Sequence, residues 1–205
     1  MVNICRAVQV KRLTSMNFIR TAIPDVIIIE PTVFGDERGY FVETFRQDKL
    51  EDFLGFSVNF VQDNESKSSL GVLRGLHYQL APAAQTKLVR VIKGKVLDVA
   101  VDIRAGSPTF GQHVSVELSE HDKRQMFIPR GFAHGFVVLE NDTIFAYKVD
   151  NYYSPENDRG LAFDDPAIGI NWIVDKQQLQ LSAKDLRQPS LEKAELFDFA
   201  SPLYV

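Results

Sequence analysis

The chain has 205 residues and a formal net charge of −4, with 45% hydrophobic and 24% charged residues, as in an ordinary globular domain. The acidic balance argues against a general nucleic-acid binder, which needs a basic face, but allows a small anionic ligand held by a local cluster of cations. Cys5 is the sole cysteine, which excludes an intrachain disulfide and fits a reducing, cytoplasmic compartment. No apolar run approaches the ~20 residues that span a bilayer, so no membrane association is expected.

The first 15 residues differ from the rest of the chain. They contain Arg6, Lys11 and Arg12 but no long apolar stretch and no clean cleavage site, so we do not interpret them as a secretory signal. Met16 opens a segment with stronger strand character. We therefore predict an N-terminal extension over 1–15 and a single domain over 16–205.

Short runs rich in Val, Ile and Phe, separated by dense turn signals, predict strands. The expected strands are 26–29, 40–45, 88–92, 96–103, 114–118, 136–139 and 144–149. In the run from 96 to 104, alternation places Leu97, Val99, Val101 and Ile103 on one face and Asp98, Ala100, Asp102 and Arg104 on the other. Helical pattern is scarce, with short helices expected at 47–54 and near 182–186, where Ser182 is a possible cap. This pattern predicts an all-β sandwich or barrel.

The stretch Arg74-Gly75-Leu76-His77-Tyr78-Gln79 is the most informative motif. It places a histidine at a glycine corner where a strand is expected to begin, and Lys87 follows at the start of an alternating strand. The nearby cations disfavour an imidazolium unless a carboxylate offsets them, and Asp185 is a candidate for that carboxylate. A His–Asp pair would fix the tautomer and leave the other ring nitrogen as a base for an anionic substrate.

His134 lies in Pro-x-Gly-x-x-His, the second-motif pattern of cupin barrels. A metal-binding cupin would also need His-x-His and a downstream glutamate, whereas this chain has His77 followed by Gln79. We therefore expect no bound metal, and His134 as a neutral lining residue or hydrogen-bond partner.

Three further groups of residues are weaker candidates. Tyr147 and Tyr153 are ordinary strand and loop aromatics unless cations near a pocket make a phenol a proton donor or acceptor. Arg38, in the turn at 35–39, is a surface charge or a phosphate-binding guanidinium. The amides of Gln62 and Asn64 can pair with a base or a sugar edge.

Taken together, these motifs resemble the dTDP-4-dehydrorhamnose 3,5-epimerase family over about residues 18–191. The resemblance rests on six ordered segments: 34–39, 62–64, 74–79, 129–136, 151–155 and 181–185. It implies a cupin-like jelly-roll β-barrel with a few short peripheral helices. It also implies a homodimer with exchanged N-terminal strands, a dTDP-4-keto-6-deoxyhexose substrate and no cofactor.

The resemblance also implies roles for individual residues. His77 matches the base, Asp185 its orienting partner, Tyr147 the opposing acid, and Lys87 the group that faces the 4-oxygen of the sugar. Arg38 and Arg74 match diphosphate-binding arginines. Further substrate-contacting or cleft-lining positions are Phe41, Glu43, Gln62, Asn64, Asp98, His134, Tyr153 and Lys184.

The reaction implied is epimerisation at C3 and C5 of dTDP-4-dehydro-6-deoxy-D-glucose, through an enolate, in dTDP-L-rhamnose biosynthesis. Four alternatives stay open from the sequence. They are a 3- or 5-epimerase of another deoxysugar, a related ketoisomerase, a sugar-nucleotide-binding cupin without catalysis, and a metal-dependent cupin oxygenase.

Overall fold

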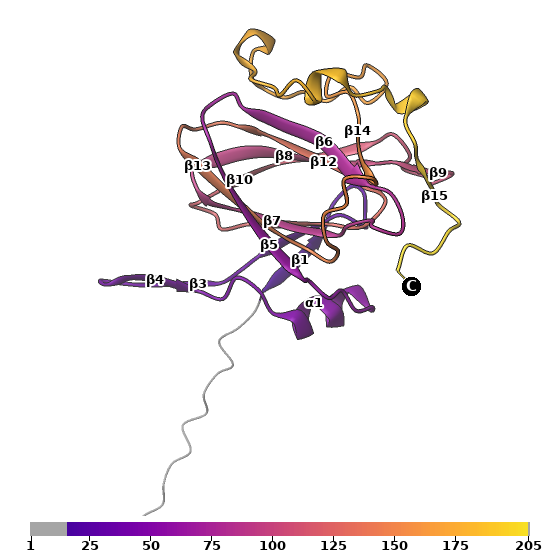
Figure 1. Ribbon diagram of the computed structural model, residues 1–205. Coiled ribbons are helices and arrows are strands. Elements are labelled where there is room, and N and C mark those ends of the chain that lie inside the picture. Colours follow the sequence, from indigo (N-terminus) through magenta and orange to yellow (C-terminus); the bar gives the residue numbers. More distant parts are fainter. Residues whose placement is uncertain (1–15, 205) are drawn as a thin grey trace, which may run out of the picture.

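The computed structural model describes residues 16–204, so the predicted extension over 1–15 lies outside the described residues. Two sheets face each other and form a flattened barrel (Figure 1). The larger sheet has the order β1 (Asn17–Arg20), β2 (Ile27–Glu30), β11 (Gln125–Ile128), β7 (Lys87–Lys93), β13 (Thr143–Val149) and β5 (Gln62–Ser68). The smaller has the order β10 (His113–Ser119), β8 (Lys95–Asp102), β12 (Phe132–Val138), β6 (Leu73–Gln79) and β14 (Asp158–Gly160). All pairings within them are antiparallel, which confirms the predicted jelly roll.

The apolar runs predicted six of these strands (β2, β7, β8, β10, β12 and β13), because each is rich in Val, Ile or Phe, and a seventh run, 40–45, corresponds to β4 of a separate hairpin. The run 40–45 is shorter than predicted, since β4 covers only Gly39–Val42. The strand β5 was missed because its sequence, QDNESKS, is polar throughout, although every second residue is turned inward. Helix α1 (Gln47–Leu54) is confirmed and ends at Gly55, whose φ of +81° is the left-handed conformation that glycine favours.

The remaining elements are short. The 3-10 turns cover Lys176–Gln178, Asp185–Arg187 and Leu191–Lys193. The helix expected near Ser182 is therefore a single turn that begins at Asp185. Two small ribbons complete the structure, β3 (Val33–Asp36) with β4, and β9 (Arg104–Ala105) in parallel with β15 (Phe197–Asp198). Among the described residues, no helix has the length and apolar character needed to cross a membrane.

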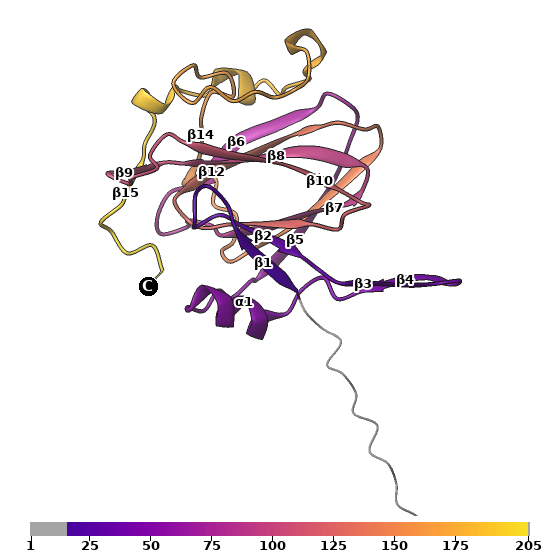
Figure 2. The ribbon, with the colours of Figure 1, turned by 180° about the vertical axis from the view of Figure 1, so that it is seen from behind.

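Three apolar layers hold the barrel together. The layer between the sheets includes Val89, Ala100 and Phe145. On one outer face, α1 covers the six-stranded sheet, as Figure 2 shows from behind, with Leu50 fully packed. On the other, the segment after β14 covers the five-stranded sheet and inserts Trp172. Because both faces of the central sheets are buried, the hydrophobic effect fixes the strands on both sides.

The alternation of β8 is confirmed, but its apolar face points outward. Leu97, Val99 and Val101 pack under the C-terminal segment, whereas Ala100 belongs to the layer between the sheets. Asp98, on the same face as Ala100, is therefore inside the barrel, where it is completely buried. A buried carboxylate needs a hydrogen-bond partner, so Asp98 indicates a polar site inside the barrel.

The β3–β4 hairpin projects away from the barrel (Figures 1 and 2). Its side chains stay in solvent, and Tyr40 and Phe41 are 61% and 68% exposed. The hairpin therefore leaves two neighbouring aromatic side chains outside the apolar layers of the barrel.

Candidate active site

The strands β6 and β12 bring two histidines together at the centre of the five-stranded sheet. His77 and His134 are register partners, and the pairing shifts just beyond them. The backbones approach closely because glycines face each other: a Cβ on Gly75 would lie 2.5 Å from the Cα of Gly135. His77 lies inside β6 rather than at its beginning, so the predicted strand start was wrong.

His77 is held by a carboxylate 108 residues further along the chain. Its Nε2–H donates to Asp185 Oδ1 over 2.5 Å, while Ser182 Oγ donates to Asp185 Oδ2 over 2.7 Å. Burial alone would raise the pKa of Asp185, but the hydrogen bonds from His77 and Ser182 outweigh it and hold that pKa below its ordinary value. The ionised carboxylate favours the tautomer that carries its proton on Nε2, in which Nδ1 is the unprotonated ring nitrogen.

His134 forms a second pair with Asp98. Its Nε2–H lies 3.0 and 3.1 Å from the two Asp98 carboxylate oxygens, and both side chains are buried. Burial lowers the pKa of His134 despite the opposing effect of Asp98. The imidazole is therefore neutral at pH 7, which agrees with the expected lining or hydrogen-bonding role.

Lys87 begins β7, as predicted, and its side chain reaches toward both histidines. Its Nζ donates to the carbonyl oxygen of His77 over 3.3 Å. Burial lowers the pKa of Lys87 to about 8, and the charges of Asp98 and Asp158 limit the shift. An amine with that pKa is mostly charged at pH 7 and sits where a carbonyl oxygen of a ligand could approach it.

Tyr147 comes from β13 in the opposite sheet and lines the same cavity. Burial raises the pKa of Tyr147, which Arg74 only partly counters, so the phenol keeps its proton. Phe136 and Phe145 stack with ring centroids 4.0 Å apart and form an apolar wall beside it. A protonated phenol against an apolar wall is suited to donate a proton.

The cavity has a volume of about 560 Å³, within the range that small-molecule sites occupy. Seven of the predicted residues line it: Asn64, Arg74, His77, Lys87, His134, Tyr147 and Asp185. Arg74 lies at an exposed position and donates to Ser68 Oγ over 3.2 and 3.3 Å, so its guanidinium keeps donors for an anion. Gln62 supports Asn64 by donating to its side-chain oxygen over 2.7 Å.

The other predicted residues lie away from this lining. Tyr153 and Lys184 both donate to Asp158 Oδ2, the tyrosine over 3.0 Å. Arg38 forms an ion pair with Asp36 on the projecting hairpin, and its side chain is 86% exposed. On and just after the same hairpin, Phe41 is exposed and Glu43 lies 3.8 Å from an arginine nitrogen. The chain does not bring these hairpin residues to its own cavity.

Sequence reasoning missed several lining residues, including Glu65, Ser66 and Ser182. Ser182 could have been found, because its spacing of three from Asp185 allows a side-chain bond to that carboxylate. Asp158, whose charge acts on Lys87, had no signal of its own in the sequence.

No group of three His, Cys, Asp or Glu side chains within residues 16–204 could hold a metal ion. Gln79 occupies the position where a metal-binding cupin would place its second histidine. Its amide donates to the carbonyls of Ala83 and Tyr152 and accepts from the Ser154 N–H, so it serves the loops. The donor set at this position therefore does not fit a metal.

Fold and site define a cupin-like barrel whose interior carries histidine–carboxylate pairs beside a lysine and a tyrosine. The family model described as dTDP-4-dehydrorhamnose 3,5-epimerase matches residues 20–193. The chain therefore belongs to this family, as its motifs predicted. It is 56% identical to the dTDP-4-dehydrorhamnose 3,5-epimerase of Shigella flexneri over 89% of this chain and 99% of that protein, and 56% identical to the Salmonella typhimurium enzyme over 88% and 98%.

Among solved structures, the chain is similar to the dTDP-6-deoxy-D-glucose-3,5-epimerase of Legionella pneumophila, crystallised in complex with dTDP-4-keto-L-rhamnose. The TM-score is 0.87 at 49% identity, and the likeness covers 91% of this chain and 100% of that one.

Proposed function

We propose that the chain epimerises dTDP-4-dehydro-6-deoxy-D-glucose at C3 and C5, giving dTDP-4-dehydro-L-rhamnose for dTDP-L-rhamnose biosynthesis. The observation that carries the proposal is one cavity lined by His77 with its Asp185 partner, by Lys87 and by Tyr147. A base, an oxyanion-stabilising cation and an acid are the groups that a proton transfer next to a ketone needs. The Legionella pneumophila relative, solved with dTDP-4-keto-L-rhamnose, supports the choice of substrate.

The proposed mechanism follows from the acidity of the sugar. The 4-keto group acidifies the hydrogens on C3 and C5, and removal of either proton gives an enolate with its charge on the 4-oxygen. His77 Nδ1 takes the proton, because Asp185 holds the other ring nitrogen protonated. Lys87 stabilises the enolate oxygen through its charge. Tyr147 returns a proton to the opposite face of the ring, which inverts the carbon. The mechanism requires no cofactor.

The diphosphate is held away from the reacting carbons. Arg74 has free donors at the edge of the cavity, and Lys184 and Tyr153 lie together at Asp158. Asn64 and Gln62 are proposed to contact the nucleoside end, and His134 with Asp98 to line the sugar end. Binding energy from the remote diphosphate positions the ring for proton transfer.

The deciding experiment is proton NMR of dTDP-4-keto-6-deoxyglucose incubated with the protein in deuterated water. Deuterium entering at both C3 and C5 is the expected result. Deuterium at one carbon only would favour a single-position epimerase. A folded protein that binds the nucleotide but exchanges neither proton would contradict the proposal and favour a binding module.

We further propose that the protein acts as a homodimer in which the β3–β4 hairpins are exchanged. The hairpin projects from its own barrel and exposes two aromatic side chains, and Arg38 is the most exposed partner of its ion pair. Arg38, Phe41 and Glu43 would then complete the diphosphate and nucleoside ends of the site in the second copy. Each site would be incomplete without its partner.

Mixing two inactive variants tests the exchange. In a hybrid dimer, the cavity of the Arg38→Ala chain keeps its own His77 and receives an intact Arg38 from the His77→Ala chain. The other cavity lacks both residues. Random mixing should therefore restore about a quarter of the wild-type sites. Mixed dimers that recover no activity would mean that the hairpin acts on its own chain or in no site.

A further inference from the structure

The beginning of β7 is held by a ring of hydrogen bonds that includes none of the groups proposed for the reaction. Thr86, the residue before Lys87, is completely buried. Its N–H donates to Asp150 Oδ1 over 2.6 Å, and its hydroxyl lies 2.7 Å from the Tyr204 hydroxyl. Arg130 closes the ring, because its Nε donates to Asp150 Oδ2 over 3.1 Å and its N–H donates to the Tyr204 oxygen over 3.1 Å.

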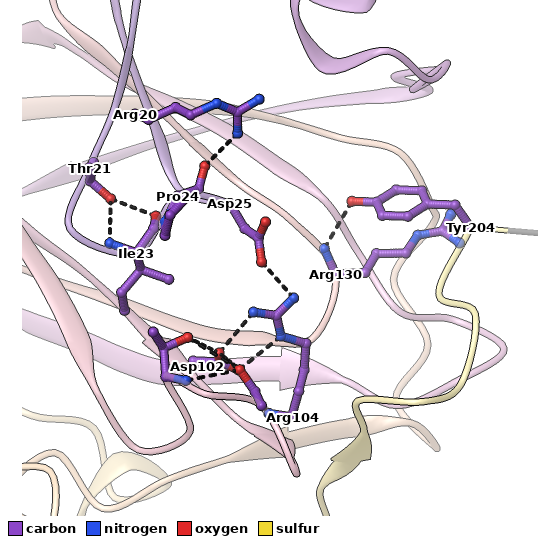
Figure 3. Close-up of polar contacts among 11 residues, drawn as sticks. Arg20, Thr21, Ile23, Pro24, Asp25, Asp102, Arg104, Arg130 and Tyr204 are labelled. Atoms are coloured by element: carbon purple, nitrogen blue, oxygen red, sulfur yellow. Dashed lines mark hydrogen bonds and ion pairs between the residues drawn. The ribbon is translucent and has the colours of Figure 1, made fainter.

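Arg130 also fixes the C-terminal tail to the barrel. Its Nη1 donates to the carbonyl of Leu203 over 2.8 Å, and its guanidinium lies 5.1 Å from the centre of the Tyr204 ring. Figure 3 shows the bond from the Arg130 N–H to the Tyr204 hydroxyl. The Tyr204 ring packs against Phe56 on another side, at 4.7 Å between centroids. The hydrogen-bond ring around Thr86 includes the ion pair of Arg130 with Asp150, which has little exposure to solvent. Charge-assisted bonds of this kind make the hydrogen-bond ring rigid.

A second cluster holds the same tail at a different place. Arg104 donates to Asp102 over 2.8 and 2.9 Å and forms an ion pair with Asp25 at 2.8 Å (Figure 3). Its guanidinium also lies 4.6 Å from the Phe132 ring centre and 5.2 Å from that of Phe199. None of these partners belongs to the ring around Thr86. The Arg104 cluster therefore supplies a matched control for effects of the tail on stability alone.

The position of Lys87 depends on its backbone anchor. A lysine side chain is a flexible stem with a point charge at its end, so its own rotamers do not fix the amine. The bond to the His77 carbonyl is long, at 3.3 Å. The charged and titratable groups around the amine are Asp98 from β8, Asp158 from β14, His77 from β6 and His134 from β12.

The hydrogen-bond ring around Thr86 contacts both β7, which carries Lys87, and β13, which carries Tyr147. Lys87 pairs with Val149 across β7 and β13, and the ring residues Thr86 and Asp150 are the chain neighbours of that pair. Tyr147 lies two residues before Val149 and thus on the same face of β13. A shift at the ring would therefore move the lysine and the tyrosine relative to each other.

We propose that Tyr204 is a positioning residue: its hydroxyl, through Thr86 and Arg130, holds β7 and β13 so that Lys87 and Tyr147 meet the substrate correctly. The proposal rests on the proposed function of these two residues. Tyr204 lies outside residues 20–193, the part of the chain matched by the family model.

The test removes the hydroxyl alone, in Tyr204→Phe. We expect kcat to fall about tenfold while KM changes little, because small misplacements of reacting groups cost rate rather than binding. Thr86→Val loses the hydrogen bond to the Tyr204 hydroxyl but keeps the N–H that binds Asp150, so it should lower kcat by the same factor. Thr86→Ser should restore the rate, and the double variant should lose no more than either single one.

A second readout is independent of activity. The pKa of Lys87 can be followed by ¹³C NMR of labelled lysine, with Lys87→Arg to assign the signal. In Tyr204→Phe this pKa should move from about 8 toward its ordinary value, because a misplaced amine gains water. The control Phe199→Leu loosens the tail at Arg104 and should leave both kcat and this titration unchanged.

Several outcomes would overturn the proposal. An unchanged Lys87 titration in Tyr204→Phe would do so whatever the activity, as would an equal loss of kcat in Phe199→Leu. If Tyr204→Phe fails to fold, a comparison of Thr86→Val with Thr86→Ser tests the same hydrogen bond between Thr86 and Tyr204. Equal rates for those two variants would reject the positioning role. A wild-type protein without proton exchange would reject the proposed function instead, and the Lys87 titration would still test the positioning.

Discussion

The two histidine–carboxylate pairs have the same chemistry but different surroundings. His77 and His134 are register partners on neighbouring strands, and each donates from Nε2 to an aspartate. The side chain of His77 is 32% exposed, whereas that of His134 is 8% exposed. The two pairs therefore differ in burial rather than in chemistry, and only the histidine proposed as the base is open to a ligand or to solvent.

The two carboxylates are both buried but come from different kinds of element. Asp185 lies at a 3-10 turn and receives a second hydrogen bond from Ser182. Asp98 lies on β8, inside the barrel, where its charge also acts on Lys87 and counters the effect of burial on that amine. The first aspartate therefore serves one histidine, and the second also balances the charge of the site.

The largest expected effect comes from His77→Ala. General-base catalysis contributes about 10² to 10⁴ in rate, so kcat should fall by about 10³ while nucleotide binding survives. Deuterium exchange followed by NMR measures the rate, and calorimetry with dTDP measures the binding. Near-normal exchange in this variant would make the assignment of the base wrong.

The two aspartates should separate in stability. Asp98→Ala leaves the Nε2–H of the buried, neutral His134 without an acceptor, so the free energy of unfolding should fall by about 2 kcal/mol. Asp185→Ala should cost about 1 kcal/mol, because His77 is 32% exposed and can bond to water in place of the carboxylate. Urea unfolding of both variants measures the difference. Equal losses would show that burial does not distinguish the pairs.

The alkaline side of the rate profile should report Lys87. Because its pKa is lowered to about 8, the charge proposed to stabilise the enolate disappears above that pH. The rate should then fall about tenfold for each further pH unit. A profile that stays flat to pH 10 would contradict the role of this lysine.

The smallest effect is the acid dependence of stability through His134. Its pKa is lowered in the folded protein, so the unfolded chain binds a proton that the folded protein does not. Stability is therefore present above the ordinary histidine pKa of about 6.5 and is lost as the pH falls, by up to about 1.4 kcal/mol per unit. His134→Gln should flatten this slope between pH 6.5 and 5. An identical slope in the variant would assign the acid dependence to other groups.

The sequence predicted much of the site because its motifs are local. His77, Lys87, Tyr147 and Asp185 were all named from their motifs, and the structure places them around one cavity. The hairpin residues Arg38 and Phe41 were named as well, but the structure does not bring them to the cavity of this chain. The polar strand β5 was missed, although it carries Asn64 and pairs with β13.

The sequence by itself determined most of the apolar strands, though not β11, together with the helix at 47–54, the faces of β8 and the family. These features depend on backbone periodicity and on short motifs, which act between near neighbours in the chain. Only the tertiary structure decided which histidine is buried, that Ser182 and Asp185 reach His77, and that Tyr204 bonds to Thr86 118 residues away. Those contacts depend on how two sheets and a C-terminal segment pack, because burial and long-range distances arise only when the whole chain has folded.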